Sequence, residues 1–410
     1  MLRERFQYYC EKVQRARRSG NLLPRLRRKA FRAIYNPSKD LIDYYWRLSA
    51  ADRRLDVSSG FSDHRGNSNH LPARETLNRI VTAYRKAKFE SAAATPDFQV
   101  RGVWAEWIAI NYRALISALD SSDLESVGKL LANCNREQFS TGTGYGYDDF
   151  IRYRIPVIGR RSVLAAWCRY RDILNELDGS LETVHFPAIG NPAGIPHNGD
   201  VLPVEALRHA CNAKQIASLL EDLLGPVILE IGGGFGGQAL QTIRASQPRK
   251  YLVFDLPEVG VLCSYMLMSA FPDSRIRLFG EGPVSAARGE NYDIGVFPHF
   301  TIQRIEDRSI DLVFNESSFS EMDASSSRAY LREVERICRR YFLHINHDVR
   351  LEFKEPGGAT SINCIASDLV PSKSFKRIYK HPRMFGRSED KLFKSYSFLY
   401  ERAQAARDTE

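Results

Sequence analysis

The sequence predicts an α/β fold in which a doubly wound, mostly parallel sheet with a C-terminal antiparallel edge hairpin follows a mostly helical N-terminal region. After residue 200, short apolar runs of strand character alternate with helix-like segments, an order typical of parallel sheets. In chain order, the predicted strands are PVILEIGG, KYLVFDLP, YDIGVFPHF, IDLVFNESSF and RYFLHINHDV. From roughly 40 to 180, apolar residues recur at three- and four-residue steps, the period of amphipathic helices. FKRIYKHPRM and KSYSFLYER, joined by GRSED, close the chain and suit the edge hairpin.

The 410 residues divide by texture into four parts. Residues 1–40 form a basic tail, and residues 41–184 form a helical region, for which we expect a role as a cap over the acceptor or in oligomerisation. Residues 185–202 contain GNPAG and are rich in glycine and proline, so we expect a long shaped loop there without helix or strand. A helix predicted over 203–224 opens the α/β domain, which extends to residue 404.

Composition indicates a cytoplasmic protein. No apolar run approaches the roughly 18 residues that cross a bilayer, and the first residues lack the features of a secretory signal. The seven cysteines are scattered and never form C-x-x-C, so the sequence favours neither a disulfide framework nor a structural zinc site.

The net charge of +9 is concentrated at the N-terminus. Residues 1–36 hold eleven Lys or Arg against two Glu, so the remaining chain is formally neutral and lacks a basic surplus that could follow phosphates. We therefore expect no nucleic-acid partner. The tail has two open interpretations: it contacts anionic lipid or an acidic partner, which would place the protein at the inner membrane surface, or it is merely solvated.

The stretch LEIGGGFGGQAL places five glycines directly after an apolar strand. Glycines allow a tight turn and a close approach to a ligand, and the following helix offers its N-terminal amides. No Gly-Lys-Ser/Thr follows, which excludes a P-loop. Gly232, Gly234 and Gly237 fit the G-x-G-x-x-G of a dinucleotide site, whereas Glu230, Gly232, Gly234 and Gly236 fit E-x-G-x-G-x-G, which suits S-adenosylmethionine.

Two acidic residues bear on this choice. Glu230 favours S-adenosylmethionine, because a carboxylate would repel a pyrophosphate but could orient a cationic methionine end. Asp255, at the end of the second predicted strand, is placed to accept hydrogen bonds from ribose hydroxyls and serves either cofactor.

Candidates for chemistry lie at the ends of the fourth and fifth predicted strands. Methyl transfer from a sulfonium to an oxygen requires alignment, and an alcohol acceptor also needs a base or a metal. Glu321 is a candidate base, although it could instead only begin the next helix. His347 and Asp348 are candidates for a base with its orienting carboxylate or for ligands of a divalent cation, and Asn315 and Ser317 for lining the cofactor cleft.

Two other histidines have weaker positions. His299 ends the strand before these and is a further cleft candidate. His344 alternates inward from His347, which favours a buried core residue.

Over residues 140–402 the sequence resembles a family of bacterial sugar O-methyltransferases, a branch of the Rossmann-like, class I S-adenosylmethionine-dependent enzymes. The resemblance is carried by GNPAG, LEIGGGFGG, FDLPE, DLVFNESSFSEMD and INHD. It implies a cofactor-binding catalytic domain over 203–404 and methylation of a sugar hydroxyl in a surface polysaccharide or other glycoconjugate. It also implies that the GNPAG loop, with Asn191, folds over the cofactor or the acceptor.

Two alternative functions stay open. FDLPEV also resembles the second-strand motif of plant-type O-methyltransferases of small molecules, which favours an aromatic or polyketide-like alcohol as acceptor. A catalytically silent scaffold could instead use the basic tail to hold a glycan-assembly complex at the membrane.

Overall fold

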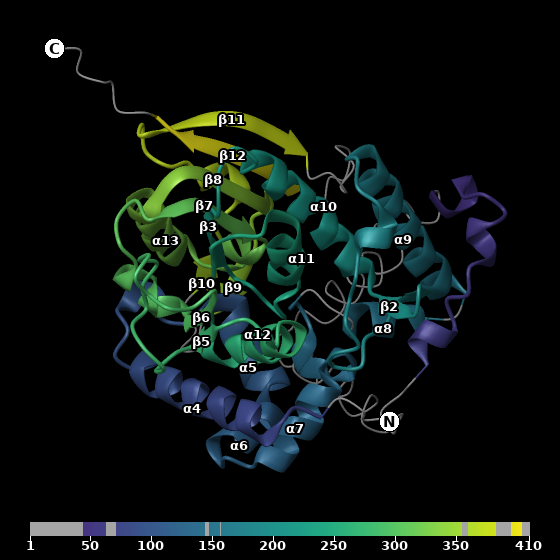
Figure 1. Cartoon of the computed structure of the whole chain (residues 1–410), viewed down its shortest axis with the longest axis horizontal. Coiled ribbons are helices and arrows are strands. Elements are labelled where there is room, and N and C mark those ends of the chain that lie inside the picture. The colour runs from purple at the N-terminus through teal and green to yellow at the C-terminus, as the bar shows by residue number, and fades with distance from the viewer. Residues whose placement is uncertain are drawn as a thin grey trace.

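The computed structural model describes residues 44–62, 71–143, 147–155, 157–354, 360–382 and 395–403. A twisted sheet runs from the top to the bottom of the left half of the molecule in Figure 1, α8 and α9 lie to its right, and α4 lies below it. The basic tail predicted over residues 1–40 and the GRSED connection of the hairpin lie outside the described residues.

The predicted helical region is confirmed. Its helices bury apolar residues at three- and four-residue steps, as in α4, where Leu77, Ile80, Val81 and Tyr84 point into the core. The helices of this region are α4 (Arg74–Ser91), α5 (Gly102–Asn111), α6 (Arg113–Asp120), α7 (Leu124–Ala132), α8 (Tyr147–Tyr153) and α9 (Ile158–Glu176).

The predicted α/β sheet is confirmed as well. Its eight strands lie in the order β11-β12-β8-β7-β3-β4-β6-β5. Neighbours from β5 to β8 pair in parallel, whereas β12 pairs antiparallel with both β8 and β11 and so forms the expected edge hairpin. The strands are β3 (Val227–Ile231), β4 (Lys250–Asp255), β5 (Ile276–Leu278), β6 (Ile294–Pro298), β7 (Ile310–Glu316), β8 (Cys338–His347), β11 (Phe375–Pro382) and β12 (Ser395–Arg402).

Helices cover both faces of the sheet. Ile228 of β3 packs into the core that α10 (Val204–Leu219), α11 (Gly237–Ser246) and α12 (Pro257–Ala270) share with the helical region. Its neighbours Val227 and Leu229 face the other core, which α13 (Ala324–Ile337) covers. This is the doubly wound arrangement, and the strand order itself confirms the predicted Rossmann-like fold class.

The structure corrects two details. Residues 185–202 are not wholly irregular, because β1 (Ile195–His197) pairs with β2 (Asp200–Leu202) in a short hairpin. The sequence also did not predict β5, since three residues are too few to show a period.

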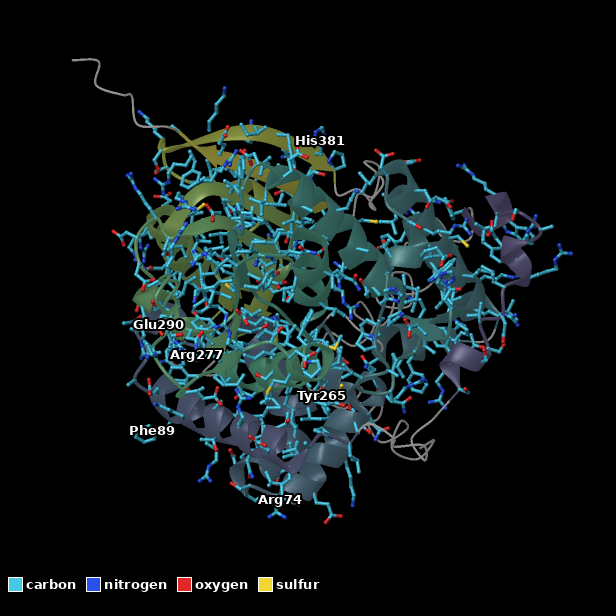
Figure 2. All side chains as sticks on the ribbon, in the orientation of Figure 1. Arg74, Phe89, Tyr265, Arg277, Glu290 and His381 are labelled. Atoms are coloured by element: carbon cyan, nitrogen blue, oxygen red, sulfur yellow. The ribbon has the colours of Figure 1, made fainter. Side chains whose placement is uncertain are left out.

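β5 is an edge strand of the sheet. Its Arg277 forms an ion pair with Glu290 at 2.5 Å, and Figure 2 shows both side chains at the left side of the molecule.

A further small sheet lies outside the central one. β9 (Glu352–Lys354) and β10 (Thr360–Ile362) form a separate two-stranded sheet. Within the described residues, no helix has the length and apolar character that a membrane crossing requires.

Candidate active site

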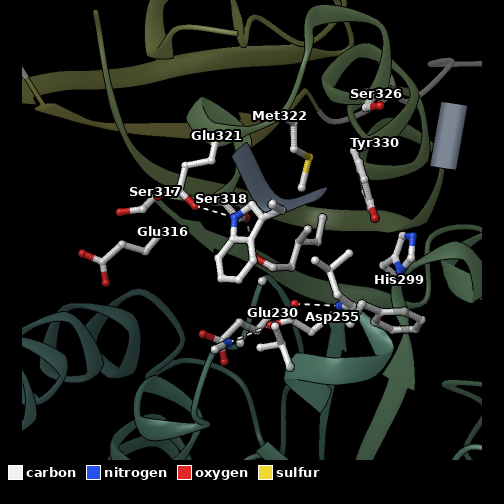
Figure 3. A pocket seen from close by; sticks show the side chains of 18 of the residues that line it. Glu230, Asp255, His299, Glu316, Ser317, Ser318, Glu321, Met322, Ser326 and Tyr330 are labelled. Atoms are coloured by element: carbon white, nitrogen blue, oxygen red, sulfur yellow. Dashed lines mark hydrogen bonds between the residues drawn. The ribbon is translucent and has the colours of Figure 1, made fainter. Parts of the chain in front are cut away.

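A cavity of about 1080 Å³, counted with its open mouth, lies at the carboxyl ends of β3, β4 and β7. β3 lies between β4 and β7. From β3 the chain first adds β4, β5 and β6 on one side and then β7 and β8 on the other, so β3 marks the point where strand order reverses. The wall combines the glycine loop after β3 with residues after β4, β6 and β7 and with residues 97–104 of the helical region. Figure 3 shows the side chains that face it.

The glycine loop adopts its conformation on the cavity wall only because it lacks side chains. Gly232 and Gly234 line the cavity with φ angles of +79° and +55°. A Cβ at Gly232 would overlap the Ser318 hydroxyl, and one at Gly234 would overlap the carbonyl oxygen of Thr143. Gly236, with φ of +88°, is the N-cap of α11 and does not line the cavity.

Asp255 is bonded to the glycine loop. One carboxylate oxygen accepts the Gly234 N–H at 2.8 Å, and the other accepts the Leu256 N–H at 2.7 Å. Burial raises the pKa of Asp255 to about 7, against the lowering effect of these two amides. The predicted ribose-binding acid therefore lies beside the glycine loop on the cavity wall.

Glu230 is the most buried of the predicted acids that reach the cavity. Its side chain, 2% exposed, accepts a hydrogen bond from the Tyr251 hydroxyl at 2.8 Å. Burial raises the pKa of Glu230 to about 8, and the nearby Asp255 and Glu316 carboxylates add to the increase. Without a ligand the group is therefore mostly protonated at neutral pH, and a cation in the cavity would favour its ionised form.

Glu321 faces the same cavity from the short 3₁₀ helix after β7. Trp104 of α5 donates its indole N–H to a Glu321 carboxylate oxygen at 2.7 Å, shown dashed in Figure 3. Burial raises the pKa of Glu321 to about 7, although the indole bond lowers it. A carboxyl that titrates near neutral pH beside the glycine loop suits general-base chemistry.

The β7 turn also positions two other predicted residues. Ser317 lines the cavity in a strained conformation, with φ of +68°. Asn315 is fully buried behind the wall, where its amide donates to the Ile231 carbonyl at 2.8 Å and accepts from Asn346 at 2.8 Å. Asn315 therefore holds β3, β7 and β8 together and does not line the cavity.

His299 lines the cavity and has a defined tautomer. Its Nε2 lies 2.8 Å from the Phe98 carbonyl and so carries the proton. Burial lowers the pKa of His299, which keeps the ring neutral. No described residue donates a hydrogen bond to its buried Nδ1, and the Asp255 backbone, like that of Phe98, raises the pKa of the ring against the effect of burial.

Other predicted residues lie outside the cavity lining. Asn191, with φ of +56°, donates its amide to Asn133 at 3.1 Å. His347 ends β8, and Asp348 accepts hydrogen bonds from the backbone and hydroxyl of Ser367 at 2.9 and 2.7 Å. The structure therefore does not bring these three residues together with Glu321 and the glycine loop.

The GNPAG loop packs behind the site. Asn135 and Arg136 bond its backbone, and a Cβ at Gly190 would meet the ring of Phe235 in the glycine loop at 3.3 Å. The loop thus supports the glycine turn and does not fold over the cavity, contrary to the expectation. His344 is buried among Phe398 and other rings, as its alternation predicts.

Sequence reasoning missed the contribution of other segments to the wall. Arg208 and His209 of α10 and residues 97–104, including Phe98 and Trp104, line the cavity. Phe98 and Trp104 lie about two hundred residues from His299 and Glu321, which they contact, so no local spacing connects them. For these two residues the cap role expected of the helical region was a signal, but no pattern singled out Arg208 or His209.

Metal binding was a further expectation. Within the described ranges, no three His, Cys, Asp or Glu side chains gather in a way that could hold a metal ion. The divalent cation stays a prediction.

Comparisons with known proteins find the chain similar to solved methyltransferase structures. No protein-family profile and no curated sequence matches this chain. A magnesium protoporphyrin IX methyltransferase from Synechocystis, with bound S-adenosylmethionine, is 10% identical at a TM-score of 0.33, covering 48% of this chain and 81% of that one. A 1,6-didemethyltoxoflavin-N1-methyltransferase from Burkholderia thailandensis, with S-adenosylhomocysteine, is 12% identical at 0.32, covering 48% and 79%.

A glycopeptide N-methyltransferase is also similar, at 15% identity and a TM-score of 0.32, covering 48% of this chain and 90% of that one. Likeness at this level assigns neither a cofactor nor a substrate to the chain. The fold and the cavity define a Rossmann-like α/β protein with a candidate ligand site at its switch point. The resemblance to sugar O-methyltransferases stays a prediction.

Proposed function

We propose that the protein is an S-adenosylmethionine-dependent O-methyltransferase that methylates a sugar hydroxyl of a glycan or glycoconjugate. The observation that carries this proposal is the position of Glu321. Its carboxyl, with a pKa of about 7, faces the same cavity as the glycine loop and Asp255. A base that ionises near neutral pH is what an alcohol acceptor needs.

The residues present fit the cofactor. Gly232 and Gly234 hold the loop on the cavity wall in a left-handed turn that a Cβ would disrupt, Asp255 offers oxygens for ribose hydroxyls, and the neutral His299 Nδ1 offers an acceptor for the amino group of adenine. Glu230, whose pKa of about 8 would fall beside a cation, suits a sulfonium. When bound, the cofactor supplies an electrophilic methyl group.

Glu321 accepts the proton of the acceptor hydroxyl as the oxygen attacks. The Trp104 N–H fixes one carboxylate oxygen and leaves the other to take the proton. Trp104 belongs to α5, so the helical region completes the site.

The acceptor class rests on the sequence resemblance, and the cavity supports it. Trp104 offers an indole surface beside the Glu321 carboxylate, and sugars present both C–H faces and hydroxyls to such pairs. The second candidate acceptor, a small aromatic or polyketide-like alcohol, is favoured by FDLPEV and would use the same base.

Mass spectrometry of the producing cell's surface glycans tests the proposal. We expect one methyl group to disappear when the gene is deleted, to return with the wild-type gene, and to stay absent with Glu321→Gln. Glu125→Gln is the control, because Glu125 forms an exposed pair with Lys129 on α7 and should restore the methyl group. Unchanged glycans after deletion would contradict the sugar acceptor, and transfer from labelled S-adenosylmethionine to small alcohols would favour the second candidate.

We further propose that the basic tail associates with the inner membrane surface or with a glycan-assembly partner. Its eleven basic residues against two acidic ones support this. Deleting residues 1–36 should lower membrane partition and spare methyl transfer. A scaffold without activity would show partition but no transfer in the full chain.

A further inference from the structure

Arg208 and Glu316 form a buried ion pair in the cavity wall that the proposed mechanism does not use. Arg208 belongs to α10 and Glu316 ends β7, and a guanidinium nitrogen contacts a carboxylate oxygen. The two side chains are 10% and 8% exposed, and both line the cavity. The pair therefore presents a positive and a negative group to whatever the cavity binds.

Neighbouring residues fix this pair in place. Glu205 accepts a hydrogen bond from Arg208 Nε, and Asn212 donates its amide to Glu316 Oε2 at 3.1 Å. A third guanidinium nitrogen, Nη2, lies 3.2 Å from His209 Nε2. An arginine has five N–H donors, so these contacts leave Arg208 with hydrogens for a ligand.

Stability alone is a weak reason for such a pair. Burying two charges costs about as much as their attraction returns, and an apolar pair of similar volume would often stabilise the fold equally well. The position of the pair on the cavity wall points to ligand binding.

The place of the pair within the cavity indicates which part of a ligand it meets. In Figure 3, Glu316 lies on the left of the view and His299 on the right, with Glu230 and Asp255 between them. If the nucleoside lies along Asp255 and His299, the other end of the ligand reaches toward Glu316. Glu321, the proposed base, lies above the left part of this path, nearer to Glu316 than to His299 in the same view.

We propose that Arg208 and Glu316 bind the zwitterionic α-amino acid end of the cofactor, Arg208 its carboxylate and Glu316 its ammonium group. The inference rests on the proposed S-adenosyl cofactor and assigns to it two residues that were not among the candidates from the sequence. Arginine binds a carboxylate through two parallel N–H bonds, and a carboxylate pairs with an ammonium, so each partner of the ion pair matches one charge of the ligand.

Calorimetric titration with two ligands tests the inference. S-adenosylhomocysteine carries the amino acid end, whereas 5′-methylthioadenosine has the same nucleoside and a thioether without it. We expect Arg208→Met and Glu316→Gln each to raise the Kd for S-adenosylhomocysteine about 10- to 100-fold, the loss of a charge-assisted hydrogen bond. The Kd for 5′-methylthioadenosine should stay within about twofold, which also shows that the variants fold.

Arg339→Met is the matched control. Arg339 pairs with the buried Asp311 at the opposite end of the same strand, β7, away from the cavity. Its loss should lower thermal stability and leave both dissociation constants unchanged.

Each other outcome has a defined meaning. If the variants weaken the binding of both ligands equally, or do not weaken the binding of S-adenosylhomocysteine, the inference is overturned and the pair has only a structural role. A wild-type protein that binds 5′-methylthioadenosine as tightly as S-adenosylhomocysteine would also overturn it, while the nucleoside site would stand. A wild-type protein that binds neither ligand would instead contradict the proposed function.

Discussion

We predict that Glu230 releases a proton when the cofactor binds, and that Glu230→Gln abolishes this release. The Glu230 carboxyl is buried with a pKa of about 8 and one hydrogen bond from Tyr251. At pH 7 such a group is about 90% protonated. A cation beside it favours ionisation, and lowering the pKa to about 6 would leave about 10% protonated. Binding at pH 7 should then release about 0.8 proton from this residue.

Calorimetry in buffers of different ionisation enthalpy measures this release. We expect wild-type protein to release more protons with S-adenosylmethionine, whose sulfur is cationic, than with S-adenosylhomocysteine, whose sulfur is neutral. Glu230→Gln should abolish most of this difference. Because Asp255 and Glu321 also titrate near pH 7, the variant and the ligand pair isolate the Glu230 contribution. An equal release by wild type and Glu230→Gln would refute the assigned role of Glu230.

Three other predictions concern the same cavity. Trp104→Phe removes the N–H that donates a hydrogen bond to Glu321, so the pKa of that carboxyl should rise. The acidic limb of the pH profile of kcat/KM should then move up by about one to two pH units, and an unshifted limb would contradict the role of the indole. Gly234→Ala should abolish cofactor binding, because a left-handed residue costs about 1–2 kcal/mol and its Cβ overlaps a backbone carbonyl, whereas Gly289→Ala, with open space around its Cβ, should bind normally in the same titration. The raised pKa of Glu230 means that the folded state binds more protons than the unfolded state between about pH 4 and 8, so the contribution of this carboxyl to the stability of the fold is lost as pH rises. The Tm of unliganded wild type should therefore fall more over that range than the Tm of Glu230→Gln. Equal falls in Tm would contradict the raised pKa.

The fold could be predicted from sequence because its strands are long and apolar. β3, β4, β6, β7 and β8 each appear as an apolar run, and helices separate most of them, which is the pattern of a parallel sheet. β5 has three residues, and the β1 hairpin follows a Pro- and Gly-rich stretch, so neither carries enough residues to show a period.

The site could be predicted only where strand ends contribute to it. Glu230, Asp255 and Glu321 follow or end strands of one parallel sheet, and parallel strands bring such ends to one edge. His347 also ends a strand, but β8 lies beyond β7 in the sheet, and this residue falls outside the cavity lining.

Residues from helices could not be predicted, because helix packing brings them to the sheet edge. Trp104 reaches Glu321 across 217 positions of sequence, and Arg208 reaches Glu316 from α10. The E-x-G-x-G-x-G pattern therefore predicted the glycine loop but did not predict Trp104 or Arg208, which line the same cavity.

Binding of S-adenosylhomocysteine against binding of NAD tests the central claim most directly. Titration of the purified full-length protein with each ligand at pH 7 should give saturable binding of S-adenosylhomocysteine, weakened in Asp255→Asn, and no binding of NAD. Saturable binding of NAD, with no binding of S-adenosylhomocysteine, would contradict the assignment of this cavity to an S-adenosyl cofactor.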